Sequence, residues 1–316
     1  MTALPVRRAH ELEACPEEQR WLIEGLWAAE AVGILGGEPK CCKSFLALDM
    51  AVAVASGAPC LRRFPTTRRG RVLLFAAEDS PAVVRQRLTG IASAVGAALD
   101  TLDIHVIVAP VLRLDVELDQ RRLEETVGAL RPMLLVLDPF VRLHRIDENV
   151  SSEVAPLLDY LRGLQRRHRV AVVLVHHARK GAAHVRAGQA LRGSSELHAW
   201  GDSNLYVRRG GDDDLSLTIE HRAARSADGI RLTLHAEGDA LALRVTDSAA
   251  PEPAPPPIPA IERVERILAE ATSPVSQREI RDLAKIRAST VGDALAALVT
   301  DGRISRIDGR YQLTRR

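Results

Sequence analysis

The sequence has few aromatic residues, few cysteines and no long apolar run. Phenylalanine, tyrosine and tryptophan together make up 3% of the chain, which argues against a surface that holds single strands by stacking bases on aromatic rings. The four cysteines lack the paired spacing of a zinc site, and a reducing cytoplasm suits them. No window reaches the roughly 18 apolar residues that a membrane span needs, and residues 1–27 do not resemble a signal peptide. We therefore expect a soluble cytoplasmic protein with no membrane partner.

An excess of charge of one sign is missing as well. The 316 residues carry a formal net charge of +2, so any nucleic-acid surface must be local. Hydrophobic residues make up 46% of the chain and charged residues 27%, which is typical of a globular protein. The length suggests two domains.

The most informative stretch is a loop that begins with glycine and ends with lysine and serine, Gly37-Glu38-Pro39-Lys40-Cys41-Cys42-Lys43-Ser44. It fits the pattern G-x-x-x-x-G-K-[ST], except that Cys42 replaces the second glycine. In this pattern backbone N–H groups surround phosphates, the lysine reaches the β- and γ-phosphates, and the hydroxyl binds Mg²⁺. We therefore predict that this loop and Phe45 bind ATP, with Ser44 on the metal. If the loop needs a positive φ at Cys42, the side chain costs roughly 1–2 kcal/mol there.

Apolar strands and amphipathic helices alternate after this loop, which predicts an α/β fold with a mostly parallel sheet covered on both faces. Ser80 and Pro81 are expected to cap and begin one of the helices. The strands are expected at 32–35, 71–77, 104–108, 133–137 and 170–175, and the helices at 45–55, from 81, at 121–130 and at 152–167. Short strands then follow without helices, which predicts an antiparallel extension with turns at 210–212 and 228–229. The expected extension strands are 204–207, 215–219, 230–234 and 241–245.

A proline-rich stretch, residues 251–259, reads as a semi-rigid linker that ends a first domain of residues 1–250. Residues 260–316 then show three amphipathic segments and a hairpin that turns at 308–309, the pattern of a winged helix-turn-helix domain. Ser276 and Glu279 predict a capping box for its second helix, with Ile280 and Leu283 facing inward. Ser289 or Thr290 is expected to cap its third helix.

Two acidic residues at predicted strand ends are candidates for phosphate chemistry. Asp138 follows the apolar run 133–137, and we expect it to hold Mg²⁺ beside Ser44 from the strand adjacent to the loop. A role as an ordinary turn residue is the alternative. Glu78 follows the strand 71–77 and is the predicted general base that orients the attacking water. Its alternative is a helix N-terminal acid, the role that we assign to Asp79.

The histidine pair at 176–177 ends another central strand, where ligand crevices form. We favour His177 as the group that senses the γ-phosphate, although either histidine can instead be structural. The loop that follows is basic, and its Lys180, Arg186 and Arg192 are predicted to contact the backbone of single-stranded DNA. Arg222 is the candidate arginine finger toward a neighbouring subunit. Ordinary solvated surface is the alternative for the loop and for Arg222.

The region from about residue 21 to residue 225 resembles the RecA-type ATPases, and within them the branch of RepA-type hexameric plasmid replication helicases. The motifs that carry the resemblance are residues 37–44, 77–79, 137–140 with 147–149, 176–181 and 192–195. The resemblance implies a homo-oligomer, possibly a hexamer, that hydrolyses Mg-ATP. It also implies that Glu78 activates water, that Asp138 serves Mg²⁺, that the histidine pair contacts the γ-phosphate and that the next loop faces a DNA channel.

Two features depart from that family, namely Cys42 and the C-terminal tail. If the tail is a DNA-binding module, duplex DNA is its expected ligand. The residues predicted to contact that duplex are Arg287, Ser289, Thr290, Arg303, Arg306 and Arg310. The leading hypothesis is an ATP-driven DNA helicase or translocase of a replication or mobile-element system. The alternatives are a nucleotide-controlled DNA-binding or loading factor, and a signalling ATPase whose tail docks a protein.

Overall fold

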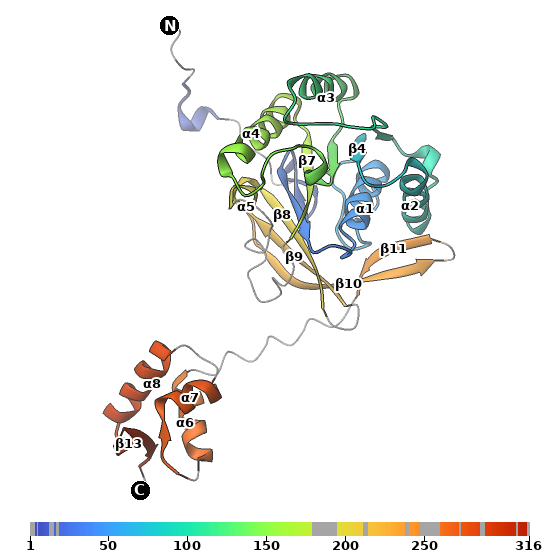
Figure 1. Cartoon of the computed structure of the whole chain (residues 1–316). Coiled ribbons are helices and arrows are strands. Elements are labelled where there is room, and N and C mark those ends of the chain that lie inside the picture. The colour runs from blue at the N-terminus through green and yellow to red at the C-terminus, as the bar shows by residue number, and fades with distance from the viewer. Residues whose placement is uncertain are drawn as a thin grey trace. The chain divides into compact units, whose positions relative to one another are not determined.

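The computed structural model describes residues 4, 6–12, 16, 19–178, 195–210, 214–237, 240–246, 260–271, 273–284, 288–307 and 309–314. The chain divides into two compact units, residues 1–247 and 248–316 (Figure 1). Each unit has its own hydrophobic core.

The larger unit alternates strands and helices as expected through its first half. Its strands are β1 (Trp21–Ile23), β2 (Trp27–Ala28), β3 (Val32–Gly37), β4 (Val72–Ala76), β5 (Ile104–Val106), β6 (Leu134–Asp138), β7 (Ala171–His177), β8 (Ser203–Arg209), β9 (Leu215–His221), β10 (Ala227–Glu237) and β11 (Ala240–Val245). Its helices are α1 (Lys43–Ser56), α2 (Pro81–Ala94), α3 (Glu117–Leu130), α4 (Ser151–His168) and α5 (Ser195–Trp200), with 3-10 turns η1 (Ala9–Glu11), η3 (Leu99–Thr101) and η4 (Phe140–Arg142). Ser80 caps α2 and Pro81 begins it, as predicted.

Nine strands of this unit form one sheet in the order β11-β10-β9-β8-β3-β7-β6-β4-β5. The pairs from β8 to β5 are parallel, and those from β8 to β11 are antiparallel. The expected parallel sheet with an antiparallel extension is therefore confirmed. Strand β7 lies between β3 and β6, so the expectation that Asp138 comes from the strand adjacent to the loop is wrong. The strand order arises because the chain makes two separate βαβ crossovers within this sheet.

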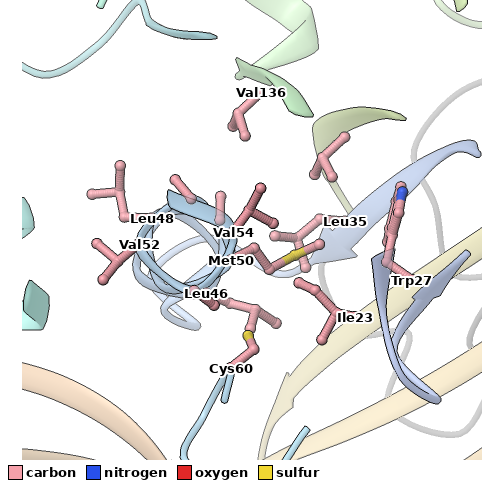
Figure 2. Packing of buried hydrophobic residues seen from close by; sticks show 14 of the residues in the cluster. Ile23, Trp27, Leu35, Leu46, Leu48, Met50, Val52, Val54, Cys60 and Val136 are labelled. Atoms are coloured by element: carbon pink, nitrogen blue, oxygen red, sulfur yellow. The ribbon is translucent and has the colours of Figure 1, made fainter. Parts of the chain in front are cut away.

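The two faces of the sheet carry different cores. Helices α1 and α2 pack on one face together with residues of β10 and β11, whereas α3, α4 and α5 pack on the other (Figure 1). Helix α1 is apolar almost all round, as a helix enclosed by protein should be. Figure 2 shows its side chains, including Leu46, Met50 and Val54, pointing to several sides toward Leu35, Val136 and the hairpin of β1 and β2.

The antiparallel extension differs from the prediction at one turn. Asp228 and Gly229 lie inside β10, at a shift in register between the pairs Ala227 with Ile219 and Ile230 with Leu217. The chain reverses earlier, between the end of β9 and the start of β10. The Asp-Gly pair marks a bulge here, because a glycine with positive φ serves a bulge as well as a hairpin turn. The short pair β1 and β2 and helix α5 were not predicted.

The smaller unit contains α6 (Ala260–Glu270), β12 (Val275–Ser276), α7 (Gln277–Ala284), α8 (Ala288–Thr300), β13 (Ile304–Ile307) and β14 (Arg310–Leu313). Its three strands pair in the order β12-β14-β13. The capping box is confirmed: the Ser276 amide donates to the Glu279 carboxylate at 2.8 Å, and the Glu279 amide donates to the Ser276 hydroxyl at 3.3 Å. The assignment of these elements to a winged helix stays a prediction.

Two details of the smaller unit were predicted wrongly. Ile280 is buried, but Leu283 is 65% exposed and Ala284 takes the inward position, because α7 ends there and its last turn packs through the smaller side chain. Helix α8 begins at Ala288, so Ser289 and Thr290 lie inside its first turn and neither is its cap. In the described part of the chain, no helix has both the length and the apolar composition needed to cross a bilayer.

Candidate functional site

The carboxyl ends of four parallel strands meet at one cavity of the larger unit. Gly37 of β3 pairs with His177 of β7, and Ala76 of β4 pairs with Asp138 of β6, so the strands of each pair end together. The cavity has a volume of about 330 Å³. It is lined by Lys40, Cys41, Cys42, Lys43, Ser44, Phe45, Ala76, Glu78, Asp79, Arg87, Asp138 and His177. Such a strand-end crevice is where open α/β sheets bind ligands.

The loop between β3 and α1 curls around the lysine that it carries. The Lys43 ammonium donates to the carbonyl of Glu38 at 2.6 Å, and the Lys43 side chain is buried. Lys40 and Cys42 both have φ of 64°, the left-handed conformation that glycine usually supplies. The structure therefore confirms the positive φ that the sequence raised as a cost at Cys42. A Cβ on Gly37 would lie 2.3 Å from the carbonyl oxygen of Val207, so the loop begins where two backbones approach too closely for a side chain.

The end of strand β8 contacts this loop from outside. Arg209 at the end of β8 donates to the carbonyl of Lys40 at 2.7 Å. Burial raises the pKa of Cys41 and of Cys42, which keeps both thiols neutral near pH 7. No sequence motif pointed to Arg209, since only the pairing of β8 with β3 brings it to the loop.

Asp138 lines the cavity and is half-buried. Burial raises its pKa to about 6, against the lowering effects of a hydrogen bond from the Ser44 hydroxyl and of the Lys43 charge. The backbone also ties its strand to β4, because the Ala77 amide donates to the Asp138 carbonyl at 2.8 Å. Ser44 and Asp138 thus place a hydroxyl and a carboxylate side by side at the base of the cavity.

Glu78 and Asp79 follow β4 and face different partners. The Arg142 guanidinium donates to the Glu78 carboxylate at 2.9 Å, whereas Asp79 forms an ion pair with Arg87. The guanidinium of Arg87 also stacks 5.1 Å from the ring centroid of Phe45. Arg87 lines the cavity but was not predicted from the sequence, because nothing distinguishes it from the other polar residues of α2.

The two histidines at the end of β7 point to different sides of the sheet. His176 is buried, and its ring lies edge-on to Phe140 at 5.8 Å. His177 lines the cavity and is half-buried, and its Nδ1 has no hydrogen-bond partner among the described residues. Burial lowers the pKa of His177, and the nearby Lys43 charge lowers it further. Strand alternation therefore brings one histidine to the cavity and the other into the core.

Arg222 lies at the far end of the extension, outside the set of residues that line the cavity. It forms an ion pair with Asp202 at 3.2 Å and donates to the carbonyl of Ala199 at 2.7 Å, and its side chain is 54% exposed. Lys180, Arg186, Arg192 and Arg287 lie outside the described residues, as does the side chain of Ser289.

The other tail residues predicted to contact DNA lie on the exposed surface of the smaller unit. Thr290 is on α8, and Arg306 on β13 stacks 5.7 Å from the ring of Tyr311. Arg303 pairs with Glu265 of α6, and Arg310 lies 3.8 Å from Glu279 and donates to the carbonyl of Pro274. Arg303 and Arg310 thus have acidic partners within their own unit.

The residues around the cavity fit a magnesium nucleotide. A hydroxyl and a carboxylate are the hard oxygen ligands that Mg²⁺ prefers, and Ser44 and Asp138 supply both. The buried ammonium of Lys43 is suited to phosphate oxygens, and so is Nδ1 of the cavity-lining His177, for which the described residues offer no hydrogen-bond partner. Lys43 would hold the phosphates, and Ser44 with Asp138 would hold the metal.

Several solved structures are similar to this chain, at identities of 13% to 16%. A DnaB-like replicative helicase, solved in a study of its interactions with primase, shares 13% identity over 68% of this chain and 57% of its own, with a TM-score of 0.53. The RadB recombinase shares 16% over 69% of this chain and 92% of its own, with a TM-score of 0.49. A KaiC-like protein from the archaeon Pyrococcus horikoshii shares 14% over 70% and 93%, with a TM-score of 0.47.

At these identities the likeness to the helicase concerns the fold alone. Residues 2–183, which are more than half of the chain, match the family model described as an AAA domain. The chain therefore belongs to the AAA domain family, and its larger unit shares the fold of the helicase structure.

Proposed function

We propose that this protein is a DNA-associated ATPase, a RepA-like helicase or translocase of a replication or mobile-element system. The observation that carries the proposal is the convergence of Lys43, Ser44, Glu78, Asp138 and His177 on one cavity from four strand ends. These are the groups that phosphoryl transfer to water requires: phosphate binding, metal binding, a base and a γ-phosphate sensor.

In this proposal each residue has one task. Lys43 neutralises the phosphates, and Ser44 with Asp138 holds the metal, which supplies charge stabilisation at the transferring phosphoryl group. Glu78 accepts a proton from the attacking water. His177 contacts the terminal phosphate through Nδ1 and passes its presence to the chain that follows β7.

The DNA contacts and the assembly belong to the same proposal. Lys180, Arg186 and Arg192 grip a single strand, and the smaller unit acts as a winged helix that binds duplex DNA through Arg287, Ser289, Thr290, Arg303, Arg306 and Arg310. The subunits form a homo-oligomer, possibly a hexamer, in which Arg222 leaves Asp202 to reach the nucleotide of a neighbouring subunit. The interpretation as an ATP-driven DNA motor is supported by the similarity in fold to the helicase and by the proposed catalytic residues that line the cavity.

Calorimetry and turnover assays test the ATPase part. Titration of Mg-ATP should release heat with the wild type, and Lys43→Ala should weaken binding about 10- to 100-fold through loss of charge-assisted hydrogen bonds. Glu78→Gln should keep binding and slow turnover by about a hundredfold or more, since it removes a general base. Glu117→Gln is the control, because this exposed carboxylate of α3 lies outside the cavity lining, and its turnover should stay near that of the wild type. Absence of binding heat from folded wild-type protein would refute the proposal.

A second candidate is a nucleotide-controlled DNA-loading factor whose smaller unit selects the site. The observation that favours it is that Arg306 on β13 and Thr290 on α8 are exposed in a unit with its own core. An Arg306→Glu variant should then lose duplex binding and keep ATPase activity. Strand displacement that is driven by ATP and unaffected by Arg306→Glu would favour the motor instead.

A further inference from the structure

Arginines gather at the end of the sheet opposite the cavity. Strands β4, β6 and β7 begin there side by side, since the Met133 amide donates to the Arg71 carbonyl at 2.8 Å and the Ala171 amide donates to the Met133 carbonyl at 3.0 Å. Helices α3 and α4 end only a few residues before β6 and β7 begin. Six arginines lie on these helix ends and strand starts, and we call them the amino-end patch: Arg69, Arg71, Arg131, Arg166, Arg167 and Arg169.

Contacts between the elements hold the patch together. The Arg71 guanidinium donates to the carbonyl of the last residue of α3, at 2.6 Å. The Arg167 guanidinium donates to the Glu124 carboxylate at 2.7 Å, which ties α4 to α3. Arg69 donates to a carbonyl in the last turn of α1, at 3.0 Å. The patch is therefore one surface, formed by three helix ends and the strands that begin beside them.

The patch carries more positive charge than its surroundings neutralise. Two of the six arginines have a carboxylate partner, because Arg71 pairs with Asp103 and Arg167 pairs with Glu124. The other four are exposed, and among the residues that the structure describes no carboxylate lies within 4.0 Å of them. On a chain whose net charge is only +2, this is a strong local concentration of cations. Such a surface attracts polyanions.

Two of these arginines occupy positions where glycine would be less strained. Arg131 and Arg169 are the C-caps of α3 and α4, with φ of 49° and 52°. Glycine is the usual residue in this left-handed conformation, because it has no Cβ. A cation at a helix C-terminus gains from the helix dipole, but that gain is no larger than the strain of a side chain at positive φ. Helix stability alone therefore favours glycine at both caps, and a further interaction is required to explain the arginines.

We propose that the amino-end patch binds the phosphate backbone of duplex DNA. Guanidinium groups bind phosphate oxygens through charge-assisted hydrogen bonds, and such contacts require no readout of the bases. None of the six residues is aromatic, so the patch offers no ring on which an unpaired base could stack, and a duplex suits it better than a single strand.

This inference goes beyond the proposed ATPase function, and it uses none of the residues that line the nucleotide cavity. Strand β6 has five residues, so about 15 Å of sheet separates the patch from the cavity. The patch is also distinct from Lys180, Arg186 and Arg192 and from the smaller unit, because all six arginines belong to other segments of the larger unit.

The experiment measures binding of the full-length protein to a short fluorescein-labelled DNA duplex by fluorescence anisotropy, without nucleotide and at several KCl concentrations. One variant carries both Arg131→Gly and Arg169→Gly, and a second carries both Arg131→Lys and Arg169→Lys. Arg166→Gln removes a charge from the patch without changing a helix cap. Arg121→Gln is the control, because this arginine lies in the first half of α3 and is 67% exposed. Each variant is also combined with Arg306→Glu, so that binding by the smaller unit does not hide a loss at the patch.

The glycine pair should weaken duplex binding about 10-fold or more near physiological salt. It should also reduce the slope of log affinity against log salt by about 2, since two phosphate contacts are lost. Its thermal unfolding midpoint should equal or exceed that of the wild type, because glycine relieves the strain at both caps. The lysine pair should keep most of the affinity, and Arg166→Gln should lose about fivefold with a slope change of about 1. Arg121→Gln should bind as the wild type does.

Wild-type affinity of the glycine pair, with and without Arg306→Glu, would overturn the inference. An equal loss in the lysine pair or in Arg121→Gln would also overturn it, since neither change removes a charge from the patch. Loss of binding to phosphatidylserine vesicles at unchanged duplex affinity would assign the patch to a lipid surface instead. If the wild type hydrolyses ATP and the glycine pair binds the duplex normally, the inference fails and the ATPase function stands. If the wild type binds no Mg-ATP and the glycine pair loses the duplex, the inference stands and the ATPase function fails.

Discussion

Replacing Asp138 with asparagine should stabilise the nucleotide-free protein at neutral pH while weakening its use of Mg-ATP. Burial raises the pKa of Asp138 from 3.8 to about 6, so the charged carboxylate is disfavoured in the folded state. Each unit of pKa difference corresponds to about 1.4 kcal/mol, and the shift therefore destabilises the folded protein by about 3 kcal/mol once the group is ionised in both states. Asparagine keeps the shape of the side chain and removes this destabilisation.

The sign follows from the protons bound in each state. Between pH 3.8 and about 6 the folded protein holds more protons on Asp138 than the unfolded chain, so the wild type loses stability as pH rises through this window. The advantage of Asp138→Asn should be close to zero at pH 4 and reach about 3 kcal/mol above pH 7.

The assay is urea unfolding at several pH values, followed by tryptophan fluorescence. All three tryptophans, Trp21, Trp27 and Trp200, belong to the larger unit, so the signal reports on that unit alone. Asp202→Asn is the control: this carboxylate pairs with Arg162 and Arg222, and its neutralisation should destabilise at pH 7.5. Saturating Mg-ATP should stabilise the wild type, by about 2.7 kcal/mol at 100 times its Kd, and should stabilise Asp138→Asn less. A variant that is no more stable than the wild type at pH 7.5, or a difference that does not change with pH, would refute the reasoning.

Two further substitutions test the loop and the core. Cys42→Gly should keep nucleotide binding and stabilise the fold by about 0.5–1 kcal/mol, because the backbone strain of a side chain at positive φ exceeds the added freedom of glycine in the unfolded chain. Cys41→Gly removes a buried side chain and should destabilise the fold. Thermal unfolding compares the two variants. Phe140→Ala should cost about 3–5 kcal/mol in urea unfolding, since the ring is fully buried against His144 and His176, and a loss below 1 kcal/mol would contradict that packing.

Local chemistry made much of the site predictable. The residues of the loop 37–44 are consecutive, so their spacing alone predicted a phosphate-binding loop. Asp138 and Glu78 were recognised as acidic residues at the ends of apolar strands. The capping box of Ser276 and Glu279 could also be predicted from the sequence, because both residues lie within one helical turn.

Other residues of the site come together only through long-range pairing. Arg209 reaches the loop because β8 lies beside β3, and Arg142 reaches Glu78 because β6 lies beside β4. Leu283 was misplaced for a related reason: its spacing fits an inward face, but α7 ends one residue later and packs through Ala284. Periodicity describes an isolated helix, whereas burial depends on which neighbours cover it.

The sequence by itself determined the order of strands and helices, the phosphate loop and the acidic strand ends, since these depend on neighbouring residues and on short-range periodicity. Only the tertiary structure decided that β7 separates β3 from β6, which histidine faces the cavity, and that Arg142 pairs with Glu78. These outcomes depend on the order in which crossovers stack the strands and on side chains far apart in the chain. The free energy that selects among such arrangements comes from the packing of the whole sheet against its two helical layers.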